Sequence, residues 1–190
     1  FLSLFDDGFN VFGSWNRLRS SCFLPLFEDA IRINPRNYFA YNLLGLEEAN
    51  AGRYEKALQY YHISLKMNPN NDQAYNNAGN VFLILGKYPY AYNYYQKAIM
   101  INDKQAMAYY NLGVLMAVNN KNHQAVMLFK KTLSITPQYL DAYVSLGITL
   151  LKMGNIDEAI YYFHKVLSLD ASNVAAKRGL KECMETQKKD

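Results

Sequence analysis

Residues 74–79 read AYNNAG, and three variants of this hexapeptide occur elsewhere: AYNLLG at 40–45, AYYNLG at 108–113 and AYVSLG at 142–147. The tyrosine and the glycine therefore recur every 34 residues. A fixed period of this length is typical of repeat proteins, in which each copy is one supersecondary unit stacked on its neighbours. We number the positions of each copy from 1, so that the copies span residues 38–71, 72–105, 106–139 and 140–173.

The spacing within a copy predicts two helices. Positions 4, 7, 8 and 11 are three or four residues apart and share one face of a first helix, and positions 20, 24 and 27 share one face of a second. Position 8 is always Gly, position 20 is always Ala, and position 24 is always aromatic. A helical glycine costs roughly 1 kcal/mol relative to alanine. Four glycines at one position therefore indicate that the paired helices pack closely there.

The segment between the two predicted helices favours a tight turn. Gly52, Gly86 and Gly154 stand where the first helix should end, and the third copy has Asn120 there. Gly and then Asn are the residues that most readily take the left-handed conformation that ends helices. Each copy is therefore predicted to be an antiparallel helix pair.

These residues resemble the tetratricopeptide repeat (TPR) family over about 21–190. The resemblance implies an all-α fold, a right-handed superhelical α-solenoid of antiparallel helix pairs. The implied organisation is an N-terminal arm or degenerate cap at 1–20, the second helix of an incomplete repeat at 21–37, four TPR copies at 38–71, 72–105, 106–139 and 140–173, and a capping helix at 174–190. Pro25 favours a short helix that begins near it. The arm either covers the first hairpin or docks into a groove, its own or that of a second copy.

The first helices carry a second stripe, at positions 2, 5, 6, 9, 12 and 13, on the side opposite their packed face. The family resemblance implies that this stripe lines a concave groove that binds partners. The candidate partner-binding residues are Asn42, Leu46, Gln73, Asn76, Asn77, Asn80, Tyr110, Asn111, Val114, Val118, Ser145, Ile148 and Lys152.

Four asparagines of this stripe form a predicted amide cluster: Asn76, Asn77, Asn80 and Asn111. A carboxamide both donates and accepts hydrogen bonds, so it can pair with the backbone of an extended peptide. The pattern resembles the asparagine ladder in the TPR part of O-linked N-acetylglucosamine transferases. Solvation of a polar helix face is the other explanation of these residues.

The last two copies are apolar where the stripe should meet water. Their apolar residues are Tyr110, Val114, Val118, Val144, Ile148 and Leu151. A contiguous apolar patch on a protein surface usually marks an interaction site. The alternative is that superhelical curvature buries some of these side chains against adjacent repeats.

Several functional classes are disfavoured. The formal charge of +4 comes from Lys and Arg residues mixed with acids, which argues against nucleic acid, and no apolar run reaches the roughly 18 residues of a membrane span. Cys22 and Cys183 lie far apart without CxxC spacing, which indicates a reducing compartment and a cytoplasmic protein. The histidines are isolated and no catalytic or metal-binding motif occurs, so we expect no enzyme activity, no cofactor and no metal.

The predicted function is a non-catalytic TPR scaffold that binds an extended or helical segment of another protein. An acidic chaperone tail is disfavoured, because Met107 and Asn111 stand where TPR co-chaperones have Lys and Arg. The alternatives are the substrate-recruiting arm of a larger enzyme such as a glycosyltransferase, and a structural subunit of a multiprotein assembly. The chain begins at Phe1 rather than Met, so we expect a fragment, a processed form or the ordered part of a longer protein.

Overall fold

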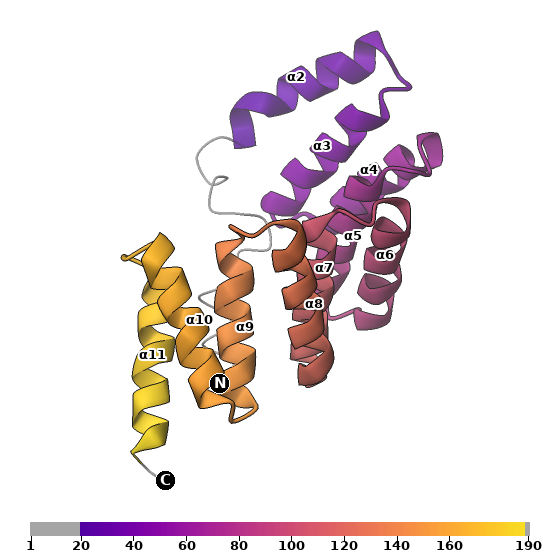
Figure 1. The fold of residues 1–190 in the computed structure, drawn as a ribbon. Coiled ribbons are helices and arrows are strands. Elements are labelled where there is room, and N and C mark those ends of the chain that lie inside the picture. The colour runs from indigo at the N-terminus through magenta and orange to yellow at the C-terminus, as the bar shows by residue number, and fades with distance from the viewer. Residues whose placement is uncertain (1–19, 189–190) are drawn as a thin grey trace. The chain divides into compact units, whose positions relative to one another are not determined.

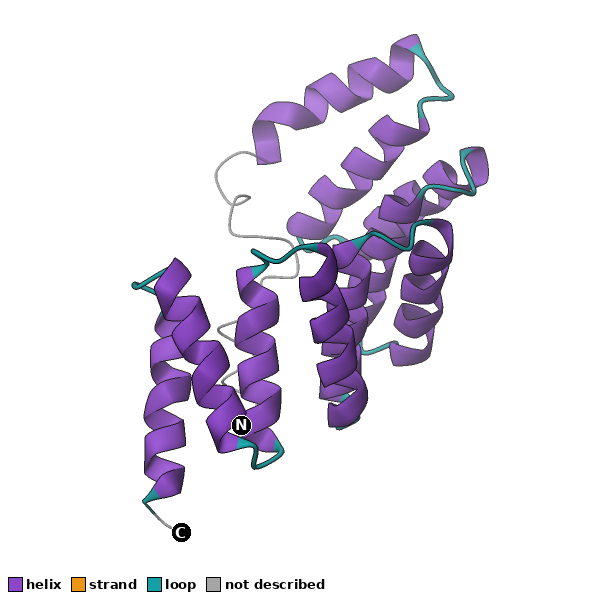
Figure 2. Cartoon of the chain, in the orientation of Figure 1, coloured by secondary structure: helices purple, strands orange, loops and turns teal. Residues whose placement is uncertain are grey.

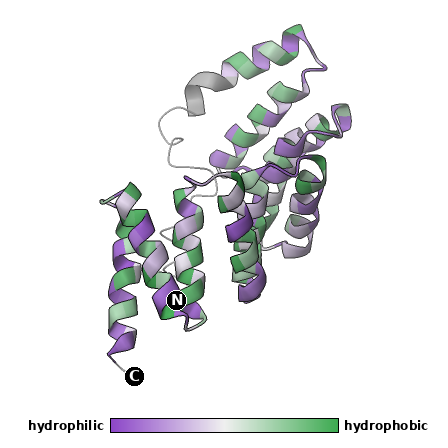
Figure 3. Cartoon of the chain, viewed as in Figure 1, coloured by the Kyte–Doolittle hydropathy of each residue, from purple (hydrophilic) through white to green (hydrophobic). Residues whose placement is uncertain are grey.

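The computed structural model describes residues 20–188, with side chains described from residue 25. Every regular element within this range is a helix (Figure 2). The predicted arm or cap at 1–20, with its proposed role in self-association, lies outside the described residues except for Ser20. Apolar and polar residues are interspersed along each helix, as expected for helices that bury one face (Figure 3).

The first helices of the copies begin 34 residues apart. They are α3 (Tyr38–Asn50), α5 (Asp72–Ile84), α7 (Ala106–Val118) and α9 (Leu140–Lys152), and α11 (Val174–Gln187) continues the series. The second helices are α4 (Tyr54–Met67), α6 (Tyr88–Ile101), α8 (Asn122–Ile135) and α10 (Ile156–Leu169), and α2 (Ser20–Ile33) precedes them. The prediction of an all-α array of helix pairs is confirmed.

The chain divides into two compact units, which we describe separately. The N-terminal unit, described over 20–108, contains α2–α6; the C-terminal unit, described over 109–188, contains α8–α11 and most of α7. Within the N-terminal unit, α3 packs against α2 and α4, and α5 packs against α4 and α6 (Figure 1). Within the C-terminal unit, α9 packs against α8 and α10, and α11 packs mainly against α10.

The position 8 glycines make room for the aromatic ring at position 24 of the same copy. A Cβ added at Gly45 or Gly79 would lie 2.6 Å from a ring carbon of Tyr61 or Tyr95. The corresponding distance is 2.7 Å for Gly113 and Phe129, and also for Gly147 and Phe163. The sequence predicts that the paired helices pack closely at this glycine. In the structure, a buried ring of the second helix makes the close contact, and the position 20 alanines are fully buried.

The predicted turns adopt left-handed backbone conformations. Gly52, Gly86 and Gly154 have φ values of 75°, 69° and 80°, and Asn120 has a φ of 58°. The prediction that Asn120 takes the same left-handed conformation as the turn glycines is confirmed.

Asparagines begin several first helices as N-caps. The side chains of Asn37, Asn71 and Asn173 each accept a hydrogen bond from the backbone N–H three residues later, which satisfies one of the free donors of a helix start. Part of the asparagine content is thus explained by capping.

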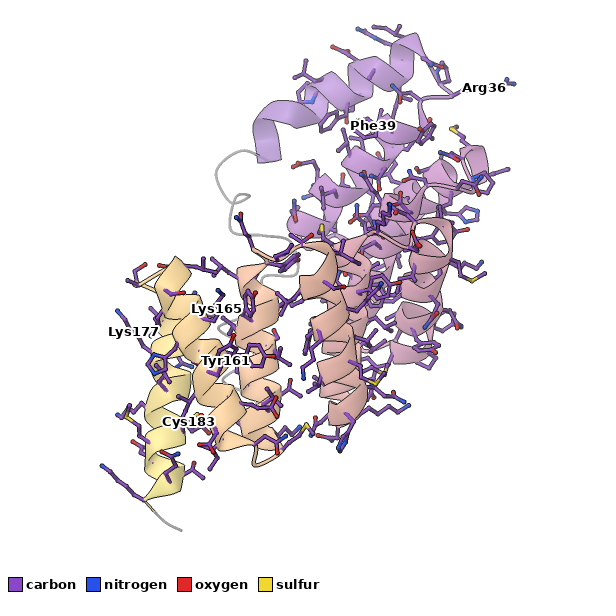
Figure 4. The ribbon with its side chains drawn as sticks, viewed as in Figure 1. Arg36, Phe39, Tyr161, Lys165, Lys177 and Cys183 are labelled. Atoms are coloured by element: carbon purple, nitrogen blue, oxygen red, sulfur yellow. The ribbon has the colours of Figure 1, made fainter. Side chains whose placement is uncertain are left out.

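The two ends of the described range differ from the repeats. Pro25 lies inside α2, which begins at Ser20, so the prediction of a helix start near Pro25 was wrong. At the other end, α11 has no glycine at position 8. It carries exposed Lys177 and Lys181, and it packs through buried residues that include Cys183 (Figure 4).

Candidate functional site

In the N-terminal unit, the predicted partner-binding residues differ widely in exposure. Gln73 is exposed, and Leu46 and Asn77 are partly exposed. Asn42, Asn76 and Asn80 are buried. Phe39, at position 2 of the first copy, is 51% exposed at the start of α3 (Figure 4).

The buried asparagines of this unit have structural partners. The Asn77 amide donates to Asn42 Oδ1 at 3.3 Å, which links α5 to α3. Asn80 Oδ1 accepts from the Tyr95 hydroxyl at 2.8 Å, within the α5–α6 pair. Most buried amides in proteins are hydrogen-bonded, and these contacts account for part of the predicted amide cluster without a ligand.

In the C-terminal unit, most of the predicted residues are buried. Tyr110, Asn111, Val114, Ser145 and Ile148 are buried, Lys152 is partly exposed, and Val118 is 41% exposed. The Lys152 ammonium donates to Asn120 Oδ1 at 2.5 Å.

Burial also removes most of the apolar patch that the sequence suggested. The structure buries Tyr110, Val114, Val144 and Ile148, so at these four positions burial, the second of the two explanations considered from the sequence, applies. The Tyr110 ring lies 5.8 Å from the Phe129 ring and 5.1 Å from the Tyr139 ring, centroid to centroid. The Tyr110 side chain therefore contributes to the packing between helices.

Contacts between consecutive first helices follow a register that the sequence analysis missed. The hydroxyls of Tyr110 and Ser145 lie 3.3 Å apart, and both pairs, Tyr110–Ser145 and Asn42–Asn77, join position 5 of one copy to position 6 of the next. In the sequence, this register is visible as polar residues of the stripe that stand 35 positions apart.

The first copy also contains a group of polar residues that the sequence analysis did not single out. Glu48 occupies position 11, where the other copies have Phe82, Met116 and Leu150. Its side chain is 1% exposed and forms ion pairs with Arg53 and, at 2.8 Å, with Lys56. Burial alone would raise the pKa of Glu48, but hydrogen bonds and charge from Arg53 and Lys56 outweigh it and lower the pKa below its ordinary value.

The preceding residue, Glu47, is in the opposite situation. Its Oε2 atom is buried and has no hydrogen-bond partner among the described residues, and burial raises the pKa of its carboxyl. Both side-chain polar atoms of Asn50 and the hydroxyl of Tyr61 are also buried and unpartnered. Burial raises the pKa of Tyr61, and the nearby Glu47 charge raises it further.

The two glutamates should therefore affect stability in opposite ways. The lowered pKa of Glu48 means that it stabilises the fold above the ordinary value of 4.5 and that this contribution is lost as the pH falls through its folded pKa. The raised pKa of Glu47 means that its ionised form destabilises the fold at neutral pH and that this cost disappears at low pH.

We expect Glu48→Gln to be less stable and Glu47→Gln to be more stable than the wild type at pH 7. Both differences should shrink below the ordinary pKa of 4.5. Urea unfolding at neutral and acidic pH measures them. If both variants changed the free energy of unfolding in the same direction, the inference that Glu47 is unpaired and Glu48 is paired would be wrong.

The described residues were predicted to hold no metal site and no membrane-spanning helix. No group of three or more His, Cys, Asp or Glu side chains in that part of the chain is arranged to hold a metal ion. His62, His123 and His164 are exposed. No described helix is both long enough and apolar enough to cross a membrane.

Comparisons with solved structures show the same fold. A crystal structure of MamA is 26% identical, with a TM-score of 0.67, and the match covers 78% of this chain and 87% of MamA. MamA from Desulfovibrio magneticus RS-1 is 22% identical, with a TM-score of 0.68, covering 83% and 89%. YrrB, described as a TPR protein with an unusual peptide-binding site, is 22% identical, with a TM-score of 0.69, covering 85% and 84%.

The sequence itself also identifies a family. No curated protein matches the chain. The family model of the cilia and flagella-associated protein 70 middle TPR-like domain matches residues 41–184, which include the four copies except for residues 38–40. The chain therefore belongs to the family of this middle TPR-like domain.

Proposed function

We propose that this chain is a non-catalytic scaffold that binds a segment of a partner protein along the stripe of its first helices. The TPR architecture supports this proposal, because TPR arrays are protein-interaction scaffolds. The fold is also shared with YrrB, a TPR protein described as having a peptide-binding site. The observation that carries the proposal is that part of the stripe in the N-terminal unit is accessible.

Among the candidate partner-binding residues of this unit, Leu46, Gln73 and Asn77 keep exposed surface. Gln73 and Asn77 offer donors and acceptors for the backbone of an extended segment, while Leu46 offers apolar contact. Of the candidate partner-binding residues in the C-terminal unit, Val118 and Lys152 keep exposed surface. The buried members of the stripe hold the accessible ones in place rather than contact the partner.

The test uses a displayed library of short random segments and the complete 190-residue chain. Selected segments are then measured for affinity by fluorescence polarisation. The double variant Gln73→Ala/Asn77→Ala should weaken binding by about tenfold or more, because it removes hydrogen bonds to the segment.

The matched control is Gln59→Ala on α4, which removes an exposed amide away from the stripe. It should bind like the wild type. Failure to select any segment, or equal affinity of the double variant and the wild type, would contradict the proposed function.

A further inference from the structure

Polar residues at positions 10, 13 and 24 have hydrogen-bond partners in the second and fourth copies but lack them in the first. In the second copy, the Tyr95 hydroxyl at position 24 donates to Asn80. In the fourth copy, Thr149 at position 10 donates to the Ser145 carbonyl at 2.7 Å, and Lys152 at position 13 donates to Asn120. The remaining residues at these positions are apolar: Val81, Ile84, Leu115, Val118, Phe129 and Phe163.

The first copy has polar residues at all three positions. They are Glu47, Asn50 and Tyr61, and their buried polar atoms have no hydrogen-bond partner within the described part of the chain. Position 9 explains the difference at Tyr61, since the first copy has Leu46 where the second has Asn80. An unpartnered buried polar group is costly, and four such atoms in one copy indicate a site that another molecule completes.

These three residues form one cluster at the edge of the stripe. Glu47 and Asn50 are three residues apart on α3 and therefore neighbours on its surface. The Tyr61 ring lies over Gly45 of the same helix, where an added Cβ would be 2.6 Å from a ring carbon, and the charge of Glu47 acts on the Tyr61 phenol. Tyr61 is 1% exposed, but Glu47 and Asn50 each keep part of their surface in solvent. The polar atoms of the cluster are themselves buried, so a ligand reaches them when the partly exposed side chains of Glu47 and Asn50 turn outward from α3, next to Leu46.

The chemistry of the cluster selects a cation. Glu47 Oε2, Asn50 Oδ1 and the Tyr61 oxygen can all accept hydrogen bonds, and Glu47 contributes a negative charge when it is ionised. A lysine ammonium or an arginine guanidinium has several donors and no acceptor, so it matches these groups. Arg53 and Lys56, which lie between Asn50 and Tyr61 in the sequence, are paired with Glu48.

We propose that Glu47, Asn50 and Tyr61 form a subsite that receives a lysine or arginine side chain of the bound segment. This inference rests on the proposed function, because the cluster borders the stripe along which the segment lies. It makes Glu47 a specificity-determining residue of the scaffold.

The experiment repeats the library selection with the wild type and with Glu47→Gln. Wild-type selections should be enriched in Lys or Arg at one fixed position, and Glu47→Gln selections should lose that enrichment but keep the other preferences. For one selected segment, replacing its fixed cation with Gln should weaken wild-type binding about tenfold or more. The same replacement should have little effect on binding to Glu47→Gln.

The matched control is Glu55→Gln, which removes an exposed carboxylate of the same charge on α4. It should preserve the cation preference. Selection of segments without a preferred cation, or an unchanged preference in Glu47→Gln, would overturn this inference and leave the proposed function standing. If the wild type selects no segment at all, both fail.

Discussion

Replacing Gly113 with Leu is expected to lower the free energy of unfolding by about 3 kcal/mol or more, at the upper end of what overpacking costs. The reason is the position of the Phe129 ring. A Cβ at Gly113 would lie 2.7 and 2.9 Å from two carbons of this ring and 3.3 Å from Leu128 Cβ. The ring is fully buried and cannot move aside without displacing its neighbours. Thermal unfolding followed by circular dichroism measures the effect, with an expected fall in Tm of about 6–12 °C.

A double-mutant cycle distinguishes this collision from a general intolerance of change. Gly113→Ala should cost less in a Phe129→Leu background than in the wild type, because the smaller side chain leaves room for the added methyl group. A Gly113→Leu variant with the melting temperature of the wild type would contradict the packing of α7 against α8.

Tyr→Phe changes at position 24 of the first two copies should have opposite effects. Tyr95→Phe removes a buried hydrogen bond to Asn80 and should cost about 1–2 kcal/mol. Tyr61→Phe removes a buried hydroxyl that has no partner among the described residues, so it should be neutral or stabilise by about 1 kcal/mol.

The two changes control for each other, because both delete one hydroxyl from a buried ring at the same repeat position. Both rings are at most 1% exposed. Urea denaturation of the two variants provides the comparison. Equal losses of stability in both would show that the Tyr61 hydroxyl is satisfied in solution, and would remove one acceptor from the proposed cation subsite.

The two proposals imply that Glu47 lowers the stability of the free protein but contributes to binding of the segment. Its ionised carboxylate destabilises the free fold, because burial disfavours the charged form. The same carboxylate is the group that would attract the cation of a bound segment. A Glu47→Gln variant that is more stable but less selective would show that the residue is kept for recognition rather than for folding.

The repeat architecture could be predicted because it depends on local sequence at a fixed period. Gly79, Tyr75 and Tyr95 recur in equivalent positions of the other copies, with Phe at the position of Tyr95 in the last two copies. Each repeat contacts mainly its neighbours. The turn conformations could also be predicted, because Gly52 and Asn120 belong to residue types that tolerate a positive φ.

The candidate site was harder to predict because exposure depends on packing between copies. Val114 and Asn77 occupy the same stripe, yet Val114 is buried and Asn77 is partly exposed and donates a hydrogen bond to Asn42 in the preceding copy. Helical spacing tells which side of a helix a residue is on, but not whether a neighbouring element covers that side.

The sequence by itself determined the helix pairs, their 34-residue period and the small residues at their crossings, since these follow from short-range spacing and residue size. Only the tertiary structure decided which polar groups have partners. Glu47 and Glu48 are adjacent and chemically identical, yet one is unpaired and the other binds two cations. The difference arises because successive residues of a helix point about 100° apart, so each carboxylate meets a different environment.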